Sequence, residues 1–163
     1  GGSLKGLELA LSIPGEKISD SLKGFGMIIS GSFTDSSIQP DPNDATQPIP
    51  GLSEEVINGT LYYENKNGFS ARVSSRYRSE YLGDIATFGP RGESFRLLQP
   101  ETVYDAQVSY TFQGGFLENT SVTLQGYNLS NEPLFATSTD DVRLVQDYQN
   151  WGAHYSIGVS RKF

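Results

Sequence analysis

The residues best suited to ligand chemistry are aromatic and arginine side chains in or beside long polar stretches of the chain. They are Tyr81, Phe88, Arg91, Phe95, Arg96, Phe135, Tyr148 and Trp151. Aromatic faces beside a few hydrogen-bonding side chains are typical of small-molecule sites, including those for sugars. An alternative is that several of these residues only pack the loops. For Trp151, a place at a membrane interface is a further alternative.

The chain offers little for catalysis or metal binding. It has no Cys and a single His, His154, so thiolate chemistry and His-based metal or triad sites have few possible ligands. The segment from Phe25 to Asn65 carries six acids and no Lys or Arg, and Asp41 and Asp44 within it offer oxygen ligands to calcium. Because the spacing is not that of a regular calcium loop, a solvated loop is the better reading. We expect no enzyme activity, no metal and no cofactor.

Composition favours β structure and argues against nucleic acid as a partner. The 163 residues include 18 Gly, nine Phe, nine Tyr and one Trp, and strong helix formers are scarce. The formal net charge of −7 disfavours binding to phosphates. No apolar run is long enough for a transmembrane helix, but transmembrane strands carry only alternating hydrophobicity.

Alternation of apolar and polar residues predicts seven strands and no helix. The segments are Ser3–Leu11, Phe25–Asp35, Glu55–Asn65, Phe69–Leu82, Glu101–Gln113, Ser121–Asn131 and Trp151–Phe163. Short links, such as the Lys66-Asn67-Gly68 turn, alternate with long polar links at Ser36–Ser53, Gly83–Pro100 and Glu132–Asn150. Outer-membrane barrels have this alternation of short turns and long loops.

The two faces of the predicted strands differ in chemistry. In the fourth segment, Arg72, Arg76 and Arg78 alternate with apolar residues, because successive side chains of a strand point to opposite faces. The same period places Asp105 and His154 on polar faces of their own strands. Three arginines in a row would be costly in a dry core, so we expect this face to line a wet or plugged lumen. A solvated sheet face is the simpler alternative.

Aromatic residues eight positions apart mark the apolar face of four predicted strands. The pairs are Phe25 and Phe33, Phe69 and Tyr77, Tyr104 and Phe112, and Tyr155 and Phe163. Eight residues cover about 26 Å of strand, or roughly 20 Å of height at a tilt of about 40°. This is close to the spacing of the aromatic girdles at the two membrane interfaces, so a lipid-facing surface is favoured over a soluble core. The alternative is a secreted, soluble β-sandwich that binds glycans.

The ordered set of motifs resembles the C-terminal end of TonB-dependent outer-membrane receptors over essentially all of residues 1–163. In chain order the matching stretches are Lys5-Gly6-Leu7-Glu8-Leu9, Phe25-Gly26, Phe33-Thr34-Asp35-Ser36, Tyr62-Tyr63-Glu64, Asn67-Gly68-Phe69-Ser70-Ala71-Arg72, Tyr77-Arg78-Ser79-Glu80-Tyr81-Leu82, Asp105-Ala106-Gln107-Val108-Ser109-Tyr110, Asn128-Leu129-Ser130-Asn131-Glu132-Pro133 and Tyr155 to the terminal Phe163. The terminal Phe is typical of an outer-membrane assembly signal. Arg161 departs from the pattern, since the outward position before that Phe is commonly apolar.

The resemblance implies an all-β, antiparallel transmembrane barrel in the outer membrane of a Gram-negative bacterium. Seven strands would then be the last of about 22, with the plug domain and the earlier strands outside this chain. It further implies import of a scarce nutrient with energy from the TonB complex, and contacts with membrane lipid, the receptor's own plug and the barrel-assembly machinery. The motifs most resemble those of receptors from carbohydrate-using Proteobacteria. We therefore expect an oligosaccharide as substrate first and a ferric siderophore second.

Overall fold

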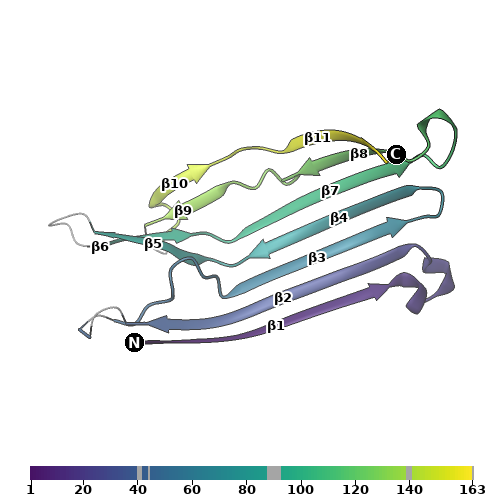
Figure 1. The fold of residues 1–163 in the computed structure, drawn as a ribbon. Coiled ribbons are helices and arrows are strands. Elements are labelled where there is room, and N and C mark those ends of the chain that lie inside the picture. Colours follow the sequence, from purple (N-terminus) through teal and green to yellow (C-terminus); the bar gives the residue numbers. More distant parts are fainter. Residues whose placement is uncertain (40–41, 44, 88–92, 139–140, 163) are drawn as a thin grey trace.

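A computed structural model describes residues 1–39, 42–43, 45–87, 93–138 and 141–162. In this part of the chain the fold is built almost entirely from antiparallel strands (Figure 1). The strands are β1 (Gly2–Pro14), β2 (Phe25–Ile38), β3 (Glu55–Glu64), β4 (Phe69–Arg78), β5 (Tyr81–Thr87), β6 (Glu93–Leu98), β7 (Glu101–Thr111), β8 (Thr120–Tyr127), β9 (Leu134–Thr137), β10 (Val145–Gln149) and β11 (His154–Arg161).

Seven of these strands form one large sheet in the order β1-β2-β3-β4-β7-β8-β11. Each corresponds to one of the seven predicted segments, so these seven strands and their order along the chain are confirmed. Every neighbouring pair is antiparallel, and the β1–β2 pairing runs from Gly2 opposite Ile38 to Pro14 opposite Gly26. In the described residues β1 and β11 each have one sheet neighbour, so the sheet is open at both edges.

The remaining four strands form a second sheet in the order β10-β9-β6-β5. The prediction of structureless links over Gly83–Pro100 and Glu132–Asn150 was therefore wrong. This order matches that of β11, β8, β7 and β4, and each short strand continues one of these beyond a break in the ladder (Figure 1). Pro100 and Pro133 lie in two of the breaks. Because proline has no backbone N–H to donate, it interrupts the hydrogen bonds of a sheet at such a point.

Short links join the strands at the opposite end of the large sheet. The predicted turn at Lys66-Asn67-Gly68 is present, and the Asn65 side chain accepts hydrogen bonds from the backbone N–H groups of Asn67 and Phe69 at 3.0 and 3.1 Å. Gly68 has a φ of 88°, a conformation that favours glycine. The other two short links contain 3-10 turns at Gly15–Lys17, Asp20–Leu22 and Gly115–Leu117. None of the helical turns in the described ranges is long and apolar enough to span a membrane.

Very little of the molecule is buried. Among the described residues, the buried hydrophobic side chains are Leu82, Leu98 and Ala136, and all three belong to the four-stranded sheet. The large sheet instead leaves leucines and isoleucines exposed, such as Ile157 at 74%. A β-sandwich would cover such a face with a second sheet. The described chain has no such cover, and the sandwich alternative is therefore wrong.

Candidate functional site

The strand registers put the predicted aromatic pairs on one face of the large sheet. Directly paired residues of antiparallel strands point to the same side. Phe25 pairs with Tyr63, and Tyr77 pairs with Ile57. Every second residue along each strand points to the same side as these residues. The described members of the set are Phe25, Phe33, Phe69, Tyr77, Tyr104, Phe112 and Tyr155. This surface, termed the apolar face, carries mostly aliphatic residues between the aromatic ones.

The aromatic residues nearest the long links lie on an oblique line across the strands. Moving from Phe33 on β2 to Tyr155 on β11, the line shifts by six residues over five strand spacings. At about 3.3 Å per residue and about 4.8 Å between strands, this slope corresponds to a strand tilt of about 40°. Transmembrane barrels have tilts of about 35–45°. A row that is oblique to the strands is therefore level in a barrel of that tilt.

At the short-turn end the aromatic rings touch one another. The ring centroids of Phe25 and Tyr63 are 4.5 Å apart, those of Tyr63 and Phe69 are 6.2 Å apart, and those of Tyr110 and Phe112 are 5.1 Å apart. Such ring pairs are worth about 0.5–1.5 kcal/mol beyond their buried area. Tyr63 and Tyr110 were not among the predicted interface aromatics, although the alternating pattern places both on this same face.

The opposite surface, termed the polar face, carries Arg72, Arg76, Asp105 and His154. Arg72 pairs with Gln107 on β7, and Arg76 with Val103, so the two guanidinium groups stand one above the other along β4. Neither has a carboxylate within salt-bridge distance among the described residues, and both side chains are exposed. The His154 ring stacks on Tyr127 with the centroids 4.8 Å apart and the planes at 19°.

Arg78, at the end of β4, is held differently from the other two arginines. Its Nε donates a hydrogen bond to the Ser53 hydroxyl at 2.6 Å, and its Nη2 donates to the Gly51 carbonyl at 3.0 Å. The guanidinium also lies 3.7 Å from the centre of the Tyr81 ring. A cation over an aromatic face adds about 0.5–2 kcal/mol. Arg78 therefore fastens the β2–β3 link to the start of β5.

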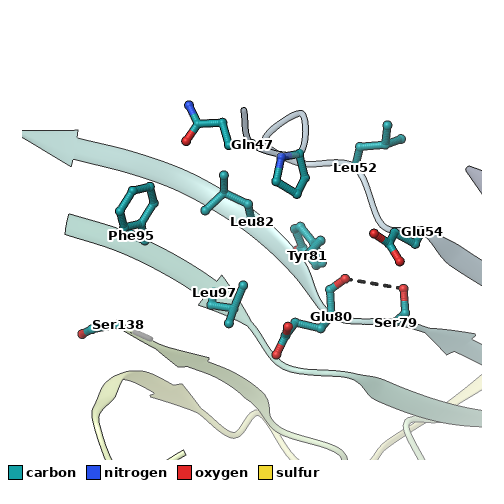
Figure 2. A pocket seen from close by; sticks show the side chains of 11 residues that line it. Gln47, Leu52, Glu54, Ser79, Glu80, Tyr81, Leu82, Phe95, Leu97 and Ser138 are labelled. Atoms are coloured by element: carbon teal, nitrogen blue, oxygen red, sulfur yellow. Dashed lines mark hydrogen bonds between the residues drawn. The ribbon is translucent and has the colours of Figure 1, made fainter. Parts of the chain in front are cut away.

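A pocket of about 480 Å³ opens beside this junction, at the long-link end of the molecule. We call it the outer pocket (Figure 2). Tyr81 and Leu82 of β5 and Phe95 and Leu97 of β6 supply its apolar side. The facing wall comes from the β2–β3 link, through Gln47, Pro48, Leu52 and Glu54. The lining residues in the described part of the chain are Gln47, Pro48, Leu52, Glu54, Ser79, Glu80, Tyr81, Leu82, Phe95, Leu97 and Ser138.

Two carboxylates and no cation line the described part of the outer pocket. The Glu80 carboxylate accepts a hydrogen bond from Gln99 Nε2 at 3.1 Å, and the same nitrogen donates to the Thr137 hydroxyl at 3.0 Å. Glu80 is thus positioned by the break between β6 and β7. Glu80 lies next to the predicted Tyr81 in the chain, but neither it nor Glu54 was among the predicted ligand contacts.

Three other predicted ligand contacts, Arg96, Phe135 and Tyr148, lie on strands of the second sheet. Arg96 on β6 forms a salt bridge of 2.6 Å with Asp147 on β10, and its other terminal nitrogen is 3.8 Å from Asp84. The rings of Phe135 on β9 and Tyr148 on β10 are 6.1 Å apart, edge to face. The structure therefore holds these residues in strands, where loops were predicted.

Trp151 lies outside the outer pocket. It precedes β11, is 68% exposed, and lines a second pocket together with Arg76 and His154. Three predicted residues, Phe88, Arg91 and Phe163, lie outside the described residues, as do Asp41 and Asp44 of the acidic segment. No group of three or more His, Asp or Glu side chains in the described ranges could hold a metal ion.

In the described part of the chain, one ion pair with shifted pKa values lies in the link between β9 and β10. Arg143 Nη2 lies 2.6 Å from an Asp141 carboxylate oxygen, and both residues belong to this exposed link. Hydrogen bonds from the Arg143 side chain, and secondly from its backbone N–H, hold the pKa of the Asp141 carboxyl below its usual value of 3.8. The same pairing raises the pKa of Arg143.

Comparison with known families identifies the sheet. The family model described as "TonB dependent receptor-like, beta-barrel" matches residues 1–129. The chain belongs to the TonB-dependent receptor family. No curated protein and no solved structure matches it.

Family membership confirms several predictions. The fold is an antiparallel β-barrel of this family, and its location is the outer membrane of a Gram-negative bacterium. TonB-dependent receptors are transporters, so the predicted absence of enzyme activity is confirmed by the family as well. The family fixes the type of transport, which is energised through TonB, but leaves the substrate open.

Proposed function

We propose that this TonB-dependent receptor imports a neutral oligosaccharide. The outer pocket is the observation that carries the proposal. It sets the rings of Tyr81 and Phe95 beside the carboxylates of Glu54 and Glu80 and the amide of Gln47. Aromatic rings cover the apolar faces of sugar rings. Carboxylates accept hydrogen bonds from sugar hydroxyls, and an amide side chain can both accept and donate them.

Charge favours a sugar over the second candidate, a ferric siderophore. An iron chelate that carries net negative charge would meet two carboxylates and, among the described lining residues, no compensating Lys or Arg. Like charges a few ångströms apart raise the free energy of binding, and because Glu54 and Glu80 are both exposed, this penalty is largest at low salt. A neutral polyol meets no such penalty.

We propose that the apolar face contacts lipid and that its two aromatic rows lie at the membrane interfaces. The face between the rows is aliphatic and exposed at Leu61, Val73, Val108, Leu124 and Ile157. Side chains of this kind gain free energy in hydrocarbon at about 25 cal/mol per Å² removed from water. In this orientation the row of Phe33, Tyr77, Tyr104 and Tyr155 is on the extracellular side, next to the long links.

The polar face then lines the lumen. Arg72, Arg76, Asp105 and His154 belong to this wall, where water or carboxylates of the receptor's plug can pair with Arg72. Seven strands with two open edges do not close a single-chain bacterial barrel, which uses an even number. We therefore propose that residues 1–163 are one section of a larger wall, completed by further strands on both sides.

Growth of a strain that lacks this receptor tests the proposal. With a panel of neutral oligosaccharides as sole carbon sources, the deletion strain should fail on at least one of them, and the full-length gene should restore growth. Loss of growth only with a ferric siderophore as the sole iron source would contradict the proposal.

Substitutions in the restored gene connect the phenotype to the outer pocket. Phe95→Ala and Glu80→Gln should slow uptake of the oligosaccharide at low concentration. Phe116→Ala is the matched control, since this phenylalanine is 88% exposed in the short turn at the opposite end. Equal uptake by the Phe95 and Phe116 variants would refute the role of the outer pocket.

A further inference from the structure

A second pocket, of about 440 Å³, lies on the polar face where the large sheet breaks into its extension. Its floor includes Arg76 on β4, Asp105 on β7 and His154 on β11, and its rim includes Glu132 and Trp151 from the links beyond β8 and β10. We call it the lumen pocket. It shares none of its described lining residues with the outer pocket.

A tied turn holds one wall of the lumen pocket in place. Asn128 has a φ of 50°, and its side chain accepts a hydrogen bond from the Glu132 N–H at 2.8 Å and donates one to the Glu132 carbonyl at 3.0 Å. The turn is anchored on β7, because the Asn128 N–H donates to Asp105 Oδ1 at 2.9 Å and the Leu129 N–H donates to the Tyr104 carbonyl at 2.8 Å. The motif from Asn128 to Pro133 thus has a structural role beside this pocket.

Backbone N–H groups position two carboxylates of the lumen pocket before any ligand arrives. Asp105 uses one oxygen for the Asn128 N–H, and Glu132 Oε1 accepts from the Thr102 N–H at 3.4 Å. A carboxylate fixed by backbone donors loses little further freedom when its remaining lone pairs accept from a ligand. Arg76 supplies a fork of donors on the same floor, without a salt-bridge partner among the described residues.

Aromatic surface completes the lumen pocket. Tyr127 and His154 stack across the β8–β11 ladder, and the Tyr127 hydroxyl donates to Gln125 Oε1 at 2.7 Å, which fixes the pair. Trp151 stands at the rim with 68% of its surface exposed. An exposed indole costs free energy in water, and a sugar ring that covers it removes apolar surface from water.

We propose that the lumen pocket is a second saccharide subsite, which holds neutral sugar units of the oligosaccharide below the outer pocket. The inference rests on the proposed function and names a further site for the same substrate class. Among the described lining residues there are three carboxylates, of Glu101, Asp105 and Glu132, and one guanidinium, that of Arg76, so an anionic ligand is disfavoured. The neighbouring hydroxyls of a sugar can instead donate to the fixed carboxylates of Asp105 and Glu132 and accept from Arg76, while the sugar ring covers the indole of Trp151.

Titration calorimetry on the full-length receptor in detergent tests the subsite, with maltohexaose, cellohexaose and xylohexaose as probes. Arg76→Gln and Trp151→Ala should each weaken binding of the preferred hexasaccharide by at least about tenfold, the effect of one charge-assisted hydrogen bond or one large aromatic contact. Arg72→Gln is the matched control, since Arg72 lies on the same face of the same strand and does not line this pocket. Trp151→Phe should recover much of the loss. Unchanged melting temperatures would show that all variants fold.

The outcomes separate the two proposals. If the wild-type receptor binds a hexasaccharide and the Arg76→Gln and Trp151→Ala variants bind it equally well, the subsite is overturned and the proposed function stays intact. Wild-type receptor that binds none of the probes and no other neutral oligosaccharide overturns the proposed function, and the subsite with it. Equal losses in the Arg72 and Arg76 variants also overturn the subsite, because the effect would then belong to the whole polar face.

Discussion

An arginine on the apolar face should destabilise the barrel, and Leu124 is the best position for the test. Leu124 on β8 pairs with Val108 and Ile157 and is 55% exposed. The extracellular aromatic row crosses β8 near residues 126–128, and Phe112 of the other row donates its N–H to the Thr120 carbonyl. Leu124 is therefore close to the middle of the membrane in the proposed orientation.

The expected cost follows from that depth. Arg at the midplane of a lipid-facing strand costs about 2–4 kcal/mol of unfolding free energy, and the cost falls toward the interfaces. Leu124→Arg should show this full penalty. Val122→Arg should cost less, since it lies two residues, or about 6.6 Å of strand, nearer the short-turn end. Thr123→Arg is the matched control on the polar face and should cost less than about 1 kcal/mol.

Urea unfolding of the full-length receptor in phosphatidylcholine vesicles provides the measurement. The order of destabilisation should be Leu124→Arg, then Val122→Arg, then Thr123→Arg. Equal costs for residues 123 and 124 would refute the assignment of the two faces. A larger cost at residue 123 would reverse it and place the arginine row against lipid.

Three local contacts give further predictions. Arg96→Ala removes the 2.6 Å salt bridge to Asp147, whose side chains are 33% and 26% exposed, and hydrogen exchange in β6 and β10 should become faster, consistent with a loss of about 0.5–1 kcal/mol. Asn128→Ala removes two side-chain hydrogen bonds to Glu132 and should speed exchange of the Glu132 amide without lowering the melting temperature of the whole barrel. The pKa of Asp141 is lowered, so its pairing stabilises the link above pH 3.8 and is lost as the pH falls through the folded pKa. Arg143→Gln should return the pKa of Asp141 toward 3.8 in an NMR titration, and an unchanged value would disprove the pairing.

The large sheet was predictable because its pattern is local. Alternation over eight or more residues places each strand, and turn residues such as Asn67-Gly68 mark its end. The parity of the two faces could also be predicted within each strand. The register between strands then aligns aromatic residues from different strands, such as Phe33 and Tyr155, in common rows. This alignment could not be predicted from any single segment.

The second sheet and the two pockets were not predictable in the same way. Strands β9 and β10 have four and five residues, too few to show a period, and β6 pairs with β9 only through Leu97 and Leu98. The salt bridge from Arg96 joins residues 51 positions apart. Long-range pairings of this kind depend on the whole topology, whereas the sequence signals were local. Glu80 and Tyr127 were missed for that reason. Glu80 is next to the predicted Tyr81 in the chain, and Tyr127 pairs with the predicted His154.

Cysteine scanning along β8 tests most directly whether the sheet separates lipid from lumen. The chain contains no cysteine, so single substitutions at residues 121 to 125 introduce the only reactive thiols in this region. In intact outer membranes, a small, charged methanethiosulfonate reagent should label positions 121, 123 and 125 and spare 122 and 124. Labelling without this period, or labelling of the even positions instead, would contradict the account.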